Sequence, residues 1–249
     1  MPEDVARGAA EVVADQLRRK PASVFALPTS RTPRLLYHEL AQRCRAGELS
    51  FKAATVFALD EYHGLPTGHP DSFRRYFEQY LLREVDLPSG AFHIAPSDSA
   101  DPSAAATAYE NAIARHGGID LAVLGIGANG HIAFNEPGSP LDGHTWLVEL
   151  APETLAAMEF QLRPGERAPR QAITMGIATI LAARRVILLA TGTDKARVVK
   201  EALQGPVVPA LPASALQRHA HCEFLIDQDA AQLLSAAPVA RDTAAGHGG

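Results

Sequence analysis

The strongest constraint on the fold of this 249-residue chain is a repeating order of short apolar run, loop and amphipathic segment. Each apolar run has the length of a buried strand, and each following segment has the apolar spacing of a helix. The expected strands are residues 22–27, 53–59, 121–124, 185–190 and 222–226, and the expected helices are residues 1–20, a segment that begins at Pro33, and residues 72–83, 102–116, 172–183 and 194–203. This alternation predicts an α/β fold with a doubly wound, mostly parallel, Rossmann-like sheet and helices on both faces.

The domain organisation follows from the absence of a clear linker or of a repeat with a fixed period. We expect residues 1–235 to form a single α/β domain. Hydrophobic residues make up 47% of the chain, and a chain of this length buries most of its apolar surface. Residues 236–249 are rich in Ala and Gly, and we expect them to be a flexible tail.

Charge and hydropathy exclude two classes of partner. The net charge is −5 with both signs interspersed, so the sequence offers no basic stripe for nucleic acid. No apolar run approaches the roughly 20 residues of a membrane helix, and the N-terminal residues lack the apolar core of a signal peptide. We therefore expect a cytoplasmic protein without nucleic-acid or membrane partners. The sequence leaves the oligomeric state open.

A glycine-rich loop, residues 125–140, follows the apolar run at 121–124. Gly125, Gly127 and Gly130 lack Cβ atoms, so the backbone here can approach a bound ligand closely. Their spacing also matches the dinucleotide fingerprint G-x-G-x-x-G. That motif needs a helix to open at once under the pyrophosphate, and Pro137 and Pro140 leave little room for one. A nucleotide cofactor is the weaker alternative, and we expect no cofactor.

Two neighbouring acids, Asp60 and Glu61, stand where the expected strand 53–59 gives way to a loop. Helix capping or a surface pair would be the simpler explanation of such a dipeptide. The apolar residues 56–59 before it, however, favour carboxylates held at the edge of a low-dielectric site. Partial burial there would raise a carboxyl pKa towards values that suit proton transfer near neutral pH.

His131 is the second candidate for acid–base chemistry. It follows the glycines and lies five residues before Glu136, a carboxylate that could fix its tautomer. A loop histidine is usually structural, but Asn129 and Asn135 in the same apolar setting favour the catalytic interpretation.

No metal site is expected. His63 and His69 lie close to Asp60, but their spacing fits no common metal site, and we expect them to be surface loop histidines. The two cysteines, Cys44 and Cys222, have no metal or redox spacing either.

The turn at Thr29, Ser30, Arg31 and Thr32 is a candidate phosphate site. Its hydroxyls and backbone N–H groups precede the expected helix, whose positive dipole end attracts anions. An ordinary N-cap by Ser or Thr is the alternative. Arg31 favours phosphate, because a guanidinium can bind it through two hydrogen bonds. Lys195 also stands at a helix start and could bind the same anion.

In doubly wound sheets, ligands bind outside the carboxyl ends of the strands. Residues 28–32, 60–70 and 125–140 all leave expected strands at that end. We therefore expect these loops to converge on one site.

Together the three loops resemble the glucosamine-6-phosphate deaminases. The matching segments are LPT at 27–29 with TP at 32–33, FALDEYHGL at 57–65 and GIGANGHIAFNEPG at 125–138, with weaker similarity in AITMG at 172–176 and GTDKA at 192–196. The HIAFNEP segment is highly specific, since the sister family of phosphogluconolactonases has a different sequence after its Gly-His. The resemblance spans nearly the whole chain.

The resemblance implies conversion of an amino-sugar 6-phosphate and water into a ketose 6-phosphate and ammonia, without metal or organic cofactor. It assigns Asp60 as the base at C2 and His131 as the proton shuttle for ring opening, held by Glu136 and Asn129. The remaining substrate- and phosphate-binding positions are Thr29, Ser30, Arg31, Thr32, Glu61, Gly127 and Lys195. A related phosphosugar isomerase or lactonase, or a sugar-phosphate sensor domain, is the alternative.

Three positions depart from the usual family pattern. Many members have aspartate where this chain has Asn129. An asparagine, unlike an aspartate, cannot stabilise an imidazolium by charge. Ser30 and Arg31 replace small, flexible residues, and Glu159 stands near the place of a phosphate-binding arginine. We hypothesise that Arg31 supplies the phosphate charge that is missing from the later segment.

Overall fold

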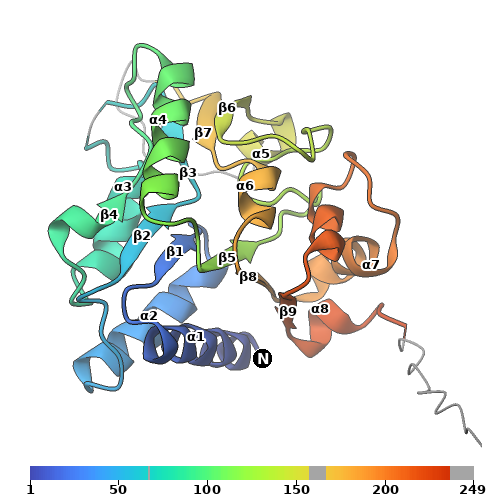
Figure 1. Cartoon of the computed structure of the whole chain (residues 1–249). Coiled ribbons are helices and arrows are strands. Elements are labelled where there is room, and N and C mark those ends of the chain that lie inside the picture. The colour runs from blue at the N-terminus through green and yellow to red at the C-terminus, as the bar shows by residue number, and fades with distance from the viewer. Residues whose placement is uncertain (67, 157–166, 236–249) are drawn as a thin grey trace, which may run out of the picture.

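The computed structural model describes residues 1–66, 68–156 and 167–235. At its centre lies a six-stranded sheet with the order β4-β2-β1-β5-β8-β9, in which every neighbouring pair is parallel (Figure 1). Its strands are β1 (Val24–Leu27), β2 (Thr55–Ala58), β4 (Phe92–His93), β5 (Leu121–Gly125), β8 (Arg185–Ala190) and β9 (Cys222–Ile226). The predicted doubly wound, mostly parallel sheet is confirmed.

Helices cover both faces of this sheet because the strand side chains alternate between two apolar clusters. In β1, Phe25 and Leu27 pack with α1 (Pro2–Arg19) and α2 (Thr32–Arg45). Val24 and Ala26 belong to the opposite cluster, which the second group of helices covers. That group comprises α4 (Pro102–Arg115), α6 (Ile177–Leu181), α7 (Ala196–Gln204) and α8 (Gln228–Ala231).

Several expected helices are shorter or less regular than predicted. The segment predicted at 72–83 begins as α3 (Phe73–Phe77) and continues as π-helical turns at Glu78–Leu82. The segment predicted at 194–203 begins with a 3₁₀ turn at Thr193–Lys195, and the α-helix starts directly after this turn, at Ala196. Further 3₁₀ turns lie at Ser89–Ala91 and Pro212–Arg218.

A second sheet, which the sequence does not reveal, has three antiparallel strands in the order β3-β7-β6. They are β3 (Asp60–His63), β6 (Trp146–Glu149) and β7 (Gln171–Thr174), and the short helix α5 (Pro152–Ala156) follows β6. The helix predicted over 172–183 is therefore wrong in its first part. Residues 172–174 pair with strands on both sides, and Gly176 lies so close to the carbonyls of Gly143 and His144 that a Cβ would be 2.2 Å from each oxygen.

Leu59 joins the two sheets. Its N–H donates to the carbonyl of Leu27 at 3.0 Å, and its carbonyl accepts from the N–H of Met175 at 2.7 Å. The chain thus leaves β2 in the large sheet and enters β3 in the small sheet across one residue. Asp60 is consequently in a strand rather than in the predicted loop, and it follows directly on a residue that is bonded to both sheets.

The glycine-rich loop contains turns instead of a helix. After β5, residues 126–145, all of them described, form turns and one isolated bridge between Ile132 and Asn135. The helix that the dinucleotide fingerprint requires does not follow Gly130. Among the described residues, no helix combines the length and apolar character needed to cross a membrane.

Candidate active site

The strand order brings four chemically distinctive segments to one edge of the large sheet. Strands β2, β1, β5 and β8 are consecutive neighbours, and all run in the same direction. Their carboxyl ends lead into Asp60, the 28–32 loop, the glycine-rich loop and the 3₁₀ turn Thr193–Lys195. The first three segments thus leave the sheet at the same end, as expected, and the turn that contains Lys195 leaves it there too.

Asp60 is a buried carboxyl group that lacks a hydrogen bond on one oxygen. The residue is 7% exposed, and its Oδ1 atom has no hydrogen-bond partner among the described residues. Burial, with a smaller contribution from the charge of Glu61, raises the pKa of Asp60 to about 8. A free buried oxygen on a group that titrates near neutral pH is suited to accepting a proton from a bound molecule.

Glu61 lies on the other face of β3, because successive strand residues point to opposite sides. Its carboxylate accepts hydrogen bonds from the backbone N–H groups of Tyr62, Phe73 and Arg74 at 2.9–3.0 Å, and so caps the start of α3. Burial raises its pKa to about 7, although these three donors oppose the shift. Its hydrogen bonds support the helix-capping alternative.

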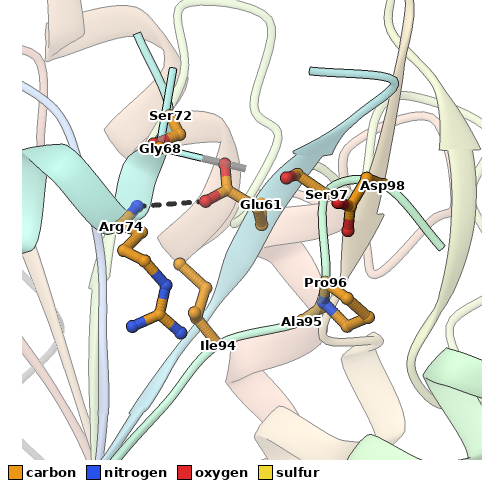
Figure 2. Close-up of a pocket in the computed structure, with 9 residues that line it drawn as sticks. All are labelled: Glu61, Gly68, Ser72, Arg74, Ile94, Ala95, Pro96, Ser97 and Asp98. Atoms are coloured by element: carbon orange, nitrogen blue, oxygen red, sulfur yellow. Dashed lines mark hydrogen bonds between the residues drawn. The ribbon is translucent and has the colours of Figure 1, made fainter. Parts of the chain in front are cut away.

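A pocket of about 180 Å³ lies beside the Glu61 carboxylate and is separate from Asp60. Figure 2 shows the carboxylate directed at the backbone nitrogen of Arg74, whose guanidinium extends away beside Ile94. Ser97 and Asp98 line the opposite wall. The loop that contains these two residues is tied to β3, because the Gly64 N–H donates to the Ser97 carbonyl at 2.7 Å.

The His131 ring packs directly against Gly127. A Cβ on Gly127 would lie 2.3 Å from the ring atom Cε1 and 2.4 Å from Nδ1. The Gly127 N–H also donates to the His131 carbonyl at 3.0 Å. The sequence predicts that Gly127 allows close approach to a ligand, whereas in the structure the close neighbour is the imidazole itself.

Glu136 is held as a carboxylate beside His131. Its Oε2 atom lies 3.4 Å from His131 Nδ1, an ion-pair distance without hydrogen-bond alignment, and accepts from Asn129 Nδ2 at 2.8 Å. The Thr154 hydroxyl donates to Oε1. Burial alone would raise the pKa of Glu136, but His131, Thr154 and Asn129 together lower it to about 2. A permanent anion therefore faces the imidazole.

Asn129 acts on the loop and on Glu136 rather than on the ring. Its Oδ1 atom accepts the backbone N–H of His131 at 3.1 Å while its amide donates to Glu136. An aspartate could not donate the second hydrogen bond. Asn129 thus orients the carboxylate that faces His131, which is a role the sequence does not indicate.

Asn135 anchors the loop to the small sheet. It is fully buried, and its amide donates to the carbonyls of Ile132 and Met175 at 3.0 and 2.8 Å. The neighbouring Phe134 N–H donates to the Thr174 hydroxyl at 3.0 Å, and Thr174 pairs with Asp60 across β7 and β3. The loop that contains His131 and the strand that contains Asp60 are therefore connected through β7.

The two histidines near Asp60, His63 and His69, differ in their exposure to solvent. No group of three or more His, Cys, Asp or Glu side chains among the described residues has a geometry that could hold a metal ion. His63 is half-buried, but the prediction that His69 is a surface residue is wrong. It is 3% exposed, and its Nδ1 atom accepts from the Asp71 N–H at 3.1 Å.

The 28–32 loop leads into α2 with its first turn uncapped. Arg31 occupies the N-cap position, no side chain there accepts a helix N–H, and the first turn has no acidic residue. The alternative of an ordinary Ser or Thr cap is therefore wrong. Ser30 has a φ of +125°, a value that side-chain-bearing residues rarely adopt. These features leave N–H groups and positive charge available to an anion.

Lys195 stands at the N-cap of α7, at the end of the 3₁₀ turn after β8. Its side chain is 22% exposed, and its ammonium lies 3.7 Å from Asp194 Oδ2. Gly192, with a φ of +92°, donates its N–H to Asp227 at 3.1 Å, which fixes the start of the turn. Glu159, the position expected to replace an arginine, and the tail 236–249 lie outside the described residues.

Two residues that support the site carry no motif in the sequence. Thr154 on α5 reaches Glu136, and Tyr76 on α3 donates its hydroxyl to the Ser30 carbonyl at 2.5 Å. Each belongs to a short helix in which a lone polar residue gives no signal. Only the tertiary arrangement brings them to the loops.

The site therefore brings a buried carboxyl group, a histidine–carboxylate pair and an uncapped helix start to the same end of the large sheet. The family model of glucosamine-6-phosphate isomerases/6-phosphogluconolactonase matches residues 1–225. The chain belongs to this family. Within the isomerase/lactonase family, the chain is 46% identical to a glucosamine-6-phosphate deaminase of Rhodopirellula baltica over 93% of this chain and 92% of that protein.

Solved structures of the family have the same fold. A monomeric glucosamine-6-phosphate deaminase superposes with a TM-score of 0.89 at 36% identity, over 94% of this chain and 97% of the other. A 6-phosphogluconolactonase from Leishmania guyanensis superposes with a TM-score of 0.75 at 23% identity, over 95% and 97% of the two chains. The second likeness concerns the fold alone.

Proposed function

We propose that the protein converts glucosamine 6-phosphate and water into fructose 6-phosphate and ammonia. The observation that carries this proposal is the pairing, at one sheet edge, of a buried carboxyl with a free oxygen and a separate histidine–carboxylate unit. The names of the similar deaminases support the same reaction. Aldose–ketose isomerisation and deamination are two parts of one proton-transfer sequence, and the reaction consumes water as a hydrolase does.

Asp60 is the base in this proposal. In the ring-opened sugar it takes the proton from C2, the substrate ammonium gives a proton to the C1 oxygen, and an enolamine forms. Return of the first proton from Asp60 to C1 then leaves an iminium group at C2. Water then adds to C2, and ammonia departs. A carboxyl with a pKa of about 8 is basic enough for this step, and a substrate ammonium beside it would favour the reactive carboxylate.

His131 opens the pyranose ring. Ring opening needs a proton removed from the C1 hydroxyl and one delivered to the ring oxygen, so the acting group must be able to accept and donate. An imidazole does both, and the anionic carboxylate of Glu136 lies 3.4 Å from its Nδ1 atom. Asn129 acts in this step by orienting Glu136.

The phosphate binds at the 28–32 loop. The uncapped first turn of α2, the residues Thr29 to Thr32 and the absence of first-turn acids support this assignment. Arg31 and Lys195 supply positive charge from two different strand ends. Because the phosphate is remote from C1 and C2, its binding serves to orient the sugar between Asp60 and His131.

The test is ammonia release from glucosamine 6-phosphate, with galactosamine 6-phosphate and 6-phosphogluconolactone as competing substrates. We expect release from the hexosamine phosphate, and a loss of at least roughly 10²-fold in kcat for Asp60→Asn, in line with removal of a general base. Arg31→Ala should raise KM and spare kcat. Lactone hydrolysis without ammonia release would assign the chain to the lactonase branch, and phosphosugar binding without turnover would indicate a sensor.

A further inference from the structure

Two tyrosine hydroxyls donate hydrogen bonds to backbone carbonyls of the 28–32 loop. Tyr37 of α2 donates to the Pro28 carbonyl, and Tyr76 of α3 donates to the Ser30 carbonyl, each at 2.5 Å. The tyrosine rings meet edge to face with centroids 6.3 Å apart. Alternate carbonyls of the loop are therefore fixed on the side where these rings pack.

Fixing a carbonyl also fixes the N–H group of the same peptide unit. A trans peptide is planar, and its C=O and N–H bonds point in opposite directions. The Ser30 carbonyl is directed at Tyr76, so the Arg31 N–H points away from Tyr76. In the same way, Tyr37 directs the Thr29 N–H away from itself.

Ser30 needs such support because of its backbone conformation. Its φ of +125° is strained for any residue with a Cβ and persists only where neighbouring groups enforce it. Without the Tyr76 hydroxyl, the peptide between Ser30 and Arg31 would rotate towards a relaxed conformation. The Arg31 N–H would then no longer point away from Tyr76.

Tyr76 itself is rigidly held. Its ring contacts Phe77 and Tyr80 at centroid distances of 5.8 and 4.8 Å, and the Arg34 guanidinium lies 5.6 Å from its centroid. Burial raises the pKa of its hydroxyl, which remains a donor at every working pH.

We infer that Tyr76 is a positioning residue for phosphate recognition: its hydroxyl locks the strained Ser30 peptide and thereby presents the Arg31 N–H to the phosphate. This inference rests on the proposed function, because that function assigns the 28–32 loop to the phosphate. In this inference Tyr76 acts through its contact with the Ser30 carbonyl.

The experiment compares Tyr76→Phe with wild type in inorganic phosphate binding by calorimetry and in steady-state kinetics. Loss of one neutral hydrogen bond predicts a rise of about 3–10-fold in the phosphate Kd and in KM, with kcat unchanged. Tyr80→Phe is the matched control, because the Tyr80 ring packs against Tyr76 and Arg34, whereas the tyrosine hydroxyls that donate to the 28–32 loop are those of Tyr37 and Tyr76. It should leave both constants unchanged.

A second background separates positioning from general stability. Glycine populates positive φ without strain, so in the Ser30→Gly background Tyr76→Phe should change the phosphate Kd by less than about twofold. An equal effect in both backgrounds, or a lower Tm with an unchanged Kd in the single variant, would overturn the inference. If wild type itself binds no phosphate, the assignment of the loop in the proposed function fails instead.

Discussion

At the scale of single residues, the contact between Gly127 and His131 determines how the imidazole is placed. The ring occupies the volume where a side chain at 127 would begin, with 2.3 Å between that Cβ and Cε1. Glycine is thus needed here for space, since its φ is not in the left-handed region. From the sequence alone, Gly127 predicts a close ligand contact. The sequence cannot show whether the space left by the missing Cβ is filled by a ligand or by a side chain of the protein itself.

Gly127→Ala should displace the imidazole and lower kcat by about 10²-fold, the effect expected of a misplacement of roughly 1 Å in a reacting group. The ring is the free end of a side chain and can rotate away, so Tm should change little. Gly125→Ala is the matched control, because a Cβ there meets no atom within 4 Å. Steady-state kinetics and thermal melts of both variants check this, and equal losses in the two would contradict it.

At the scale of elements, helix α5 is tied to the glycine-rich loop by one hydroxyl. Thr154 is buried and donates to Glu136, the carboxylate that faces His131. This hydrogen bond joins α5, which lies between strands β6 and β7 of the small sheet, to the glycine-rich loop that follows β5. The orientation of the histidine therefore depends on an element from the other sheet.

Thr154→Val should lower kcat by roughly 10- to 150-fold and leave KM unchanged, because a hydrogen bond to a charged group contributes about 1.5–3 kcal/mol. Thr154→Ser keeps the hydroxyl and should retain most of the rate. The effect should also be non-additive with Asn129→Ala, since both side chains hold one carboxylate. Rate measurements on the single and double variants test this; additive losses would count against it.

The sequence predicts those elements whose signal is local. Strands β1, β2, β5, β8 and β9 are short apolar runs, and the structure has a strand in each predicted segment. The sequence does not predict strands β3, β6 and β7, because these strands form only by antiparallel pairing between segments that are far apart in the chain. Asp60 of β3, for example, pairs with Thr174 of β7. Asp60, His131 and Glu136 stand out by motif, whereas Thr154 and Tyr76 reach the loops only through packing.

At the scale of the whole molecule, Asp60 affects stability as well as chemistry. Its pKa rises from 3.8 in the unfolded chain to about 8 in the folded protein, so the folded state retains a proton that the unfolded state has lost. Its favourable contribution is complete below pH 4 and is lost as the pH rises through 8. The protein therefore carries a carboxyl that destabilises the fold under alkaline conditions.

Asp60→Asn cannot ionise, so its stability relative to wild type should increase as the pH is raised from 5 to 9, by up to about 1.4 kcal/mol per unit. Glu61 is present in both proteins, and its own titration cancels to a first approximation. Urea unfolding at several pH values measures the difference. Asp229→Asn removes an exposed carboxyl group and is the control; a trend of equal size there would refute the assignment to burial.

The strand order has a consequence for synthesis. The segments at the sheet edge come from residues 29 to 195, and β8 pairs with β5 only after more than 180 residues have been made. Until then the nascent chain exposes one edge of β5, which is an open template for wrong pairing. We therefore expect recovery of activity during refolding to report the pairing of β8 with β5.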